Sequence, residues 1–129
     1  MSVTEVREGG VGLLGVEWVI DGSNASPDAL RSLELVTRFM NEVVVALKLT
    51  LAKPALYHQF PPPSGLTGML LLMESHMTIH TFPEHCAFTI NLYCCKARPE
   101  YDWAKVLHQF FDAKNVTITR FDRGHVVLA

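Results

Sequence analysis

Residues 68–94 read GMLLLMESHMTIHTFPEHCAFTINLYC, and this stretch decides the fold class. It contains runs of apolar and β-branched residues at 68–73, 77–82 and 87–94, separated by short polar segments, and such runs are typical of strands. Strands that follow one another directly along the chain favour a largely antiparallel sheet. We therefore expect a sheet in the middle of the chain.

Two helices are expected, one on each side of this stretch. Residues 26–28, Ser-Pro-Asp, form a helix start, with a capping hydroxyl, a proline at the first helical position and an acid in the first turn. Apolar residues then recur at spacings of three and four, which predicts one amphipathic helix over residues 27–48. A second helix is expected to open at residues 98–100, Arg-Pro-Glu.

The flanking segments complete an α+β fold. Strands are expected at 10–20 and 115–121, while the Lys53-Pro54 pair makes residues 49–60 an edge or interrupted strand. The resulting order, β-α-β-β-β-β-α-β, predicts a two-layer α+β sandwich, a mostly antiparallel sheet with two helices packed on one face. No linker divides the chain, so residues 1–129 are expected to form a single domain.

Composition narrows the function classes. The 129 residues carry a formal net charge of -2 with no basic stripe, so no nucleic-acid partner is expected. The apolar stretch at 11–20 is too short to span a bilayer and contains Glu17, so no membrane partner is expected. The three cysteines are an odd number and two of them are adjacent, which makes a poor disulfide framework. With no targeting segment evident, we expect a cytoplasmic protein.

Chemistry-bearing residues concentrate at 74–84, which reads ESHMTIHTFPE. An ordinary polar turn between two strands would explain an isolated Glu-Ser-His triplet. A zinc site from His76 and His80 with Cys86 or Cys95 is a second reading, but His-x-x-x-His suits zinc on a helix and these residues favour a strand. We therefore expect no metal cofactor.

A third reading is self-cleavage at Ser75. Its hydroxyl can attack the carbonyl carbon of Glu74 if a neighbouring base takes the proton, leaving an ester. Loss of the serine α-proton then expels the Glu74 carboxylate, and the remaining dehydroalanine hydrolyses to a pyruvoyl group. His76 and His80 are the available imidazoles. In one unbroken strand Ser75 and His80 point to opposite faces, so this reading requires a turn, a bulge or a strand end near Ser75.

The same residues resemble a known family. Phe60 to Gly65, Thr67-Gly68, the segment 74–84 and Cys95 beyond it are similar to the short prokaryotic S-adenosylmethionine decarboxylases. The resemblance implies a covalent pyruvoyl cofactor derived from the chain itself, S-adenosylmethionine as substrate, and a role in spermidine synthesis. It also implies a homodimer of cleaved protomers whose active sites are shared across the interface.

The resemblance assigns roles to the residues of the reaction. Ser75 matches the serine that becomes the pyruvoyl group, which puts the cleavage between Glu74 and Ser75. His80 matches the histidine that removes the α-proton during processing. Cys95 matches the general acid that protonates the substrate carbon after carbon dioxide leaves. Cys94 is the weaker candidate for that role, since adjacent residues of a strand face opposite ways.

It also assigns residues to the substrate. Phe60 matches an aromatic that stacks on adenine, Glu84 an acid that holds the ribose, and Thr67 a small hydroxyl residue near the cofactor. Phe82 stands where the family usually has tryptophan, and could stack on adenine or attract the sulfonium centre. An acid that is common near Asn91 is replaced by an amide.

Two other functions remain open on the sequence alone. The same cofactor chemistry could act on ornithine or arginine, which would require an acid placed to receive the distal cation. Alternatively, the chain could be an inactive paralogue that serves as a scaffold. Retention of Glu74, Ser75, His80 and Cys95 together argues against a scaffold.

Overall fold

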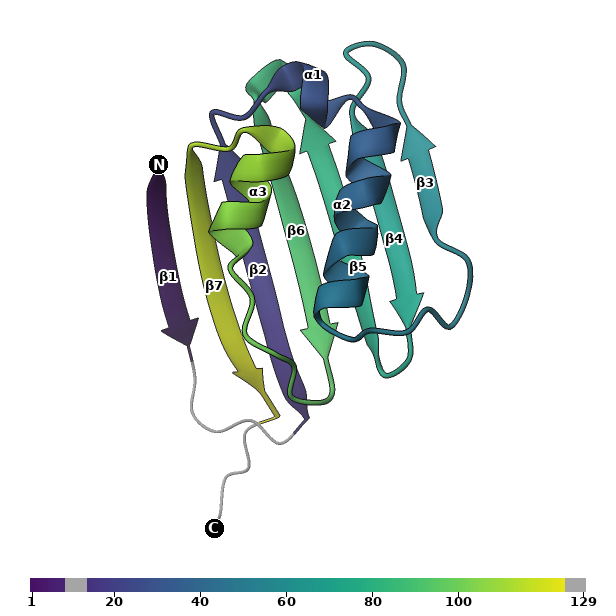
Figure 1. Cartoon of the computed structure of the whole chain (residues 1–129), viewed down its shortest axis with the longest axis vertical. Coiled ribbons are helices and arrows are strands. Elements are labelled where there is room, and N and C mark those ends of the chain that lie inside the picture. Colours follow the sequence, from purple (N-terminus) through teal and green to yellow (C-terminus); the bar gives the residue numbers. More distant parts are fainter. Residues whose placement is uncertain (9–13, 125–129) are drawn as a thin grey trace.

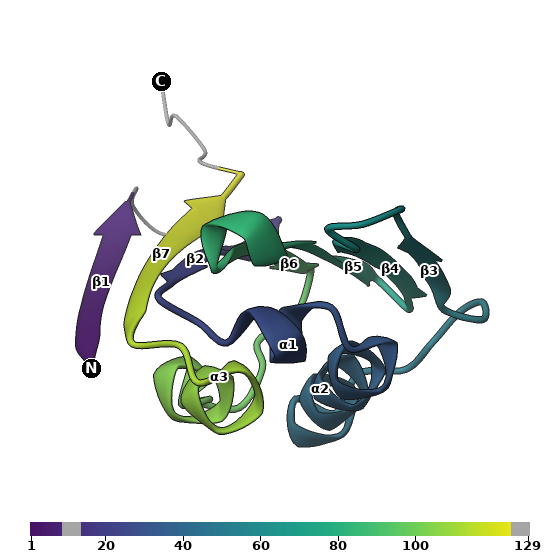
Figure 2. The ribbon, with the colours of Figure 1, turned by 90° about the horizontal axis from the view of Figure 1, so that it is seen from above.

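The described residues form one seven-stranded sheet, with helices covering one face only (Figure 1, Figure 2). The computed structural model describes residues 1–8 and 14–124. In chain order the elements are β1 (Ser2–Glu8), β2 (Gly15–Ser23), α1 (Pro27–Leu30), α2 (Leu33–Ala46), β3 (Leu56–Gln59), β4 (Leu66–Leu72), β5 (Ser75–Phe82), the 3-10 turn η1 (Pro83–His85), β6 (Ala87–Cys94), α3 (Trp103–Phe111) and β7 (Asn115–Arg123).

The strands lie in the order β1-β7-β2-β6-β5-β4-β3. All neighbours pair antiparallel except β1 and β7, which are parallel. The interrupted strand expected at 49–60 is the short edge strand β3. The predicted class, an α+β two-layer sandwich with a mostly antiparallel sheet, is confirmed.

Side chains of β5 alternate between the two faces of the sheet. Ser75, Met77, Ile79 and Thr81 are buried, and Met77 and Ile79 belong to the core beneath the helices. His76, Thr78, His80 and Phe82 point to the opposite, open face. This alternation, which follows from the two-residue period of a strand, determines which residues of the site can meet.

The helical layer supplies the other half of the core. On α2 the buried residues Val36, Phe39, Met40 and Val43 recur at helical spacing. Phe39 packs edge-on against Phe111 of α3, with ring centroids 5.3 Å apart. No helix within the described residues is both long enough and apolar enough to cross a membrane.

The single helix expected over 27–48 was wrong in one respect, because the structure contains two. After Leu30 the chain leaves helical geometry at Arg31, and Ser32 begins α2 as its N-cap. The Ser32 hydroxyl accepts a hydrogen bond from Leu35 N at 3.1 Å. A capping serine of this kind starts a new helix more favourably than it continues an old one.

Other boundaries also differ from expectation. The parallel edge strand β1 was not predicted. The strand expected at 10–20 is β2, displaced toward the C-terminus, and residues 9–13 lie outside the described part of the chain. The second helix begins after Asp102 rather than at 98–100, because the Asp102 carboxylate accepts a hydrogen bond from Lys105 N at 3.1 Å and caps the helix there.

One buried side chain joins the two layers. The Thr81 hydroxyl donates to Leu30 O at 2.7 Å and accepts from Leu66 N at 2.9 Å, so it links β5 to α1 and to β4. Thr81 is only 4% exposed, which keeps water from replacing either partner.

Thr81→Val should therefore lower the free energy of unfolding by about 2–4 kcal/mol, since it leaves a buried carbonyl and a buried amide unpaired. Urea unfolding in a Ser75→Ala background, which keeps the chain in one piece, measures the loss. Thr117→Val, at an exposed strand position, is the matched control and should stay within about 0.5 kcal/mol of its parent. Equal effects of the two variants would contradict the role of Thr81.

Candidate active site

The predicted cleavage point lies on a tight hairpin. Leu72 of β4 pairs with Ser75 of β5, so only Met73 and Glu74 form the turn. Glu74 has φ +60°, a left-handed conformation that costs a residue with a side chain about 1 kcal/mol. The strand end that self-cleavage requires near Ser75 is therefore present, although no glycine or proline marks it.

The Glu74 carbonyl is held by the neighbouring strand. Its oxygen accepts a hydrogen bond from Cys95 N at 3.1 Å. If an oxygen nucleophile adds to the Glu74 carbonyl carbon, negative charge develops on this oxygen, and a fixed backbone N–H stabilises that charge. Lys96 Nζ lies 2.8 Å from the Glu74 carboxylate, an ion pair that helps to fix the turn from outside.

Ser75 points into the helix-covered layer. Its side chain is 7% exposed, and its hydroxyl makes a long contact of 3.5 Å with Met73 O. Directly across the ladder from Ser75 is Cys94 of β6, which is fully buried. Cys95 follows at the end of β6 and is exposed.

His80 lies away from Ser75. It occupies the open face of β5, where its Nδ1 is 3.0 Å from the Thr67 hydroxyl on β4. It is five residue steps along the strand from Ser75, or about 16 Å. Within one chain the structure therefore does not bring the two residues together: they lie at opposite ends of β5 and on opposite faces.

The residues expected to bind substrate gather around His80. A cavity of about 420 Å³ is lined by Phe60, Thr67, His80, Phe82 and Glu84, together with part of the proline-rich loop before β4. Phe60 and Phe82 are 50% and 39% exposed, so their rings are available to a ligand. The volume of this cavity falls within the range of small-molecule sites.

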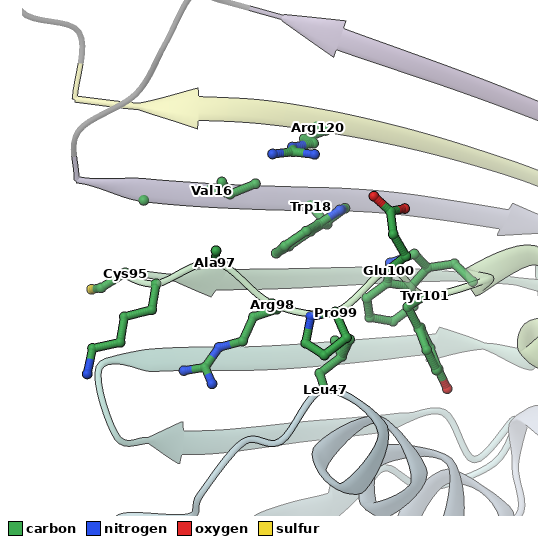
Figure 3. A pocket seen from close by; sticks show the side chains of 13 residues that line it. Val16, Trp18, Leu47, Cys95, Ala97, Arg98, Pro99, Glu100, Tyr101 and Arg120 are labelled. Carbon is green, nitrogen blue, oxygen red and sulfur yellow. The ribbon is translucent and has the colours of Figure 1, made fainter.

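A second cavity, of about 350 Å³, lies on the helix side, beside the segment that runs from Cys95 to Tyr101 (Figure 3). Cys95 stands at one end of it, and Trp18 and Arg120 line it from the sheet. Arg98 extends from the segment that follows Cys95. Burial raises the pKa of Tyr101, which also lines this cavity, to about 12.

The metal reading finds no geometric support in the part of the chain that is described. No group of three or more His, Cys, Asp or Glu side chains there could hold an ion. His76 instead stacks on Tyr93 of β6, with ring centroids 5.6 Å apart. The amide at Asn91 donates to the Glu17 carboxylate at 3.4 Å.

Sequence reasoning did not consider Lys96 at this site and ranked Cys94 below Cys95. Cys94 was set aside because it faces away from Cys95, and the two thiols do differ in this way, one buried and one exposed. The sequence alone does not give the register between β5 and β6. Only the pairing of β5 with β6 shows that Cys94 shares a face with Ser75.

Comparisons with known proteins relate this chain to one family. A family model described as S-adenosylmethionine decarboxylase matches residues 16–124. An S-adenosylmethionine decarboxylase proenzyme of Thermodesulfovibrio yellowstonii is 29% identical over 113 residues, 86% of this chain and 82% of that protein. A proenzyme of the same name from Hydrogenobaculum sp. is 37% identical over 82 residues, 64% of this chain and 60% of that protein.

A solved structure is similar over nearly the whole fold. The crystal structure of the adenosylmethionine decarboxylase from Aquifex aeolicus superposes with a TM-score of 0.74 at 26% identity, covering 92% of this chain and 98% of that one. The similarity therefore extends well beyond the motif at 74–84.

The two adjacent thiols should differ sharply in reactivity. Burial raises the pKa of Cys94, whereas Cys95 is exposed, and only the thiolate is alkylated. In folded Ser75→Ala protein, iodoacetamide should modify Cys95 at least about tenfold faster than Cys94, as read by peptide mass spectrometry. Unfolding the protein should remove the difference. Equal rates in the folded protein would show that Cys94 is not buried as described.

Proposed function

Because the chain belongs to the S-adenosylmethionine decarboxylase family, we propose that it cleaves itself between Glu74 and Ser75 and then decarboxylates S-adenosylmethionine. The cleaved domain would consist of residues 1–74 and 75–129. The three free cysteines suit the reducing cytoplasm, where we infer that the reaction takes place. Family membership supports the activity, and the geometry of the hairpin supports the cleavage.

The hydrogen bond from Cys95 N to Glu74 O is the observation that carries the cleavage. The Ser75 hydroxyl oxygen adds to the Glu74 carbonyl carbon, and the Cys95 N–H stabilises the oxyanion. Breaking the C–N bond leaves an ester and a free Ser75 amine. Removal of the Ser75 α-proton then expels the Glu74 carboxylate, and hydrolysis of the remaining dehydroalanine releases ammonia and leaves a pyruvoyl group.

The surroundings of Ser75 fit such a group. A carbonyl at the start of β5 would sit beside the exposed Cys95 and the cavity that Cys95 lines. The pyruvoyl carbonyl supplies an acceptor for the electron pair that is released as carbon dioxide leaves. Cys95 returns a proton to the substrate carbon in this proposal, and its exposure allows it to exchange that proton with solvent.

The cavity around His80 suits the nucleoside end of the substrate. The exposed rings of Phe60 and Phe82 offer faces for adenine, and the Glu84 carboxylate offers acceptors for ribose hydroxyls. Ornithine and arginine have no aromatic group that could stack on these rings. The lining therefore favours S-adenosylmethionine over the two amino acids.

The separation between Ser75 and His80 within one chain supports a homodimer. One chain alone holds Ser75 and His80 at opposite ends of β5, so a complete site requires a second copy. The open sheet face carries Met69, Leu71 and Phe82, which are 52%, 55% and 39% exposed. An apolar sheet face without helices favours burial against another surface. A two-fold pairing of these faces would bring His80 of each copy toward the Glu74–Ser75 turn of the other, from the open side of the sheet.

The substrate is tested by carbon dioxide release. Purified protein offered carboxyl-labelled S-adenosylmethionine, ornithine and arginine in parallel should release label only from the first. Cys95→Ala should still cleave, since the variant keeps its backbone N–H, but should turn over at least about 100-fold more slowly. Cys86→Ala is the matched control and should retain turnover.

Release of label from ornithine or arginine instead would show that the same cofactor chemistry acts on that substrate. A chain that remains whole and releases no label from any of the three would favour the scaffold function.

Shared sites are tested by complementation. Ser75→Ala and His80→Ala chains, each inactive alone, should form mixed dimers with one intact site when they are co-expressed. We expect about one quarter of wild-type activity, because about half of the dimers are mixed and each has one working site. Ser75→Ala co-expressed with a chain carrying both substitutions is the control and should stay inactive. Dimers that form without regaining activity would contradict a shared site.

A further inference from the structure

The Ser75 hydroxyl has no histidine of its own strand beside it. Both histidines of β5, His76 and His80, lie on the open face, while Ser75 faces the helices. A second copy docked on the open face would present its histidines to that same open side. A base for the hydroxyl proton is therefore expected in the helix-covered layer, into which Ser75 points.

Cys94 is the titratable group that the ladder places opposite this hydroxyl. Ser75 and Cys94 are register partners, and the hydrogen bond between Cys95 N and Glu74 O shows that the adjacent pair is the hydrogen-bonded one. Ser75 and Cys94 thus form the non-hydrogen-bonded type of pair, in which side chains approach most closely, with Cβ atoms about 4.5–5.5 Å apart. Both side chains are buried, at 7% and 0% exposure.

A cation stands next to this thiol. Arg98 Nη1 donates to Lys48 O at 3.2 Å, which anchors the guanidinium at the end of α2. Burial raises the pKa of Cys94, while the charge and hydrogen bond of Arg98 and the hydroxyl of Ser75 oppose that rise. Cys95 adds a small upward contribution to the Cys94 pKa, and β2 presents only Val16 across the ladder.

We propose that Cys94 is the base of the self-cleavage step. Its thiolate accepts the proton of the Ser75 hydroxyl as the oxygen adds to the Glu74 carbonyl carbon. The thiol then gives that proton to the Ser75 nitrogen as the C–N bond breaks, so that no proton is gained or lost overall. Cys94 thus serves the cleavage and Cys95 serves turnover. This assignment rests on the proposed function, because it requires that the chain cleaves itself.

The test follows the cleavage of freshly refolded, uncut chain at a series of pH values. For the wild type, the rate should rise with pH, because the thiolate fraction rises toward the elevated pKa of Cys94. Cys94→Ala and Cys94→Ser should cleave about 100-fold more slowly and lose this rise, even though serine keeps the size and the hydrogen bond. Cys86→Ser is the matched control and should follow the wild type.

Substitution of Arg98 provides a second readout, the pH dependence of the cleavage rate. This readout would not change if Cys94 contributed only packing. Arg98→Met removes the charge that stabilises the thiolate, so the rise in cleavage rate should shift to higher pH. Arg98→Lys should restore part of the shift. Far-ultraviolet circular dichroism of each uncut variant establishes that it is folded.

These experiments distinguish failure of the proposed function from failure of the role of Cys94. Wild-type chain that never cleaves would overturn both the proposed function and the role of Cys94. Wild-type chain that cleaves while folded Cys94→Ala cleaves within about threefold of it, with the same pH profile, would overturn only the role of Cys94.

Discussion

The pairing of β5 between β4 and β6 is the constraint on which the rest of the structure depends. It fixes a two-residue turn before Ser75 and places Glu74 in a left-handed conformation. It brings the Cys95 amide to the Glu74 carbonyl and sets Cys94 opposite Ser75. The same strand carries His80 to the other end and the other face of the sheet. A shift of one residue in this register would exchange the two faces and remove every one of these contacts.

Much of the fold could be predicted from local patterns. Two-residue alternation and spacings of three and four identify strands and helices without knowledge of their partners. The break between α1 and α2 escaped prediction because the apolar pattern continues through it, and only the Ser32 hydroxyl bonded to Leu35 N interrupts the helix. The edge strand β1 escaped prediction because residues 2–8 are mostly polar, and its conformation depends on pairing with β7, more than a hundred residues away.

The sequence predicted some features of the site and not others. The motif at 74–84 pointed to the cleavage chemistry, and residues expected to bind substrate do line one cavity around His80. The sequence predicted that Ser75 and His80 face apart if they share one unbroken strand, and β5 is unbroken from Ser75 to Phe82. Which cysteine faces Ser75 depends on cross-strand register, a property of two segments together. The same alternation that first set Cys94 aside places it beside the serine once the pairing with β5 is known.

The central claim is that the Glu74–Ser75 bond breaks and leaves a carbonyl at the start of β5. The mass spectrum of the denatured, purified protein tests it most directly. The account predicts two fragments, residues 1–74 and 75–129, the second with a blocked N-terminus whose mass corresponds to a pyruvoyl group. A single chain of full length that persists after long incubation would contradict it.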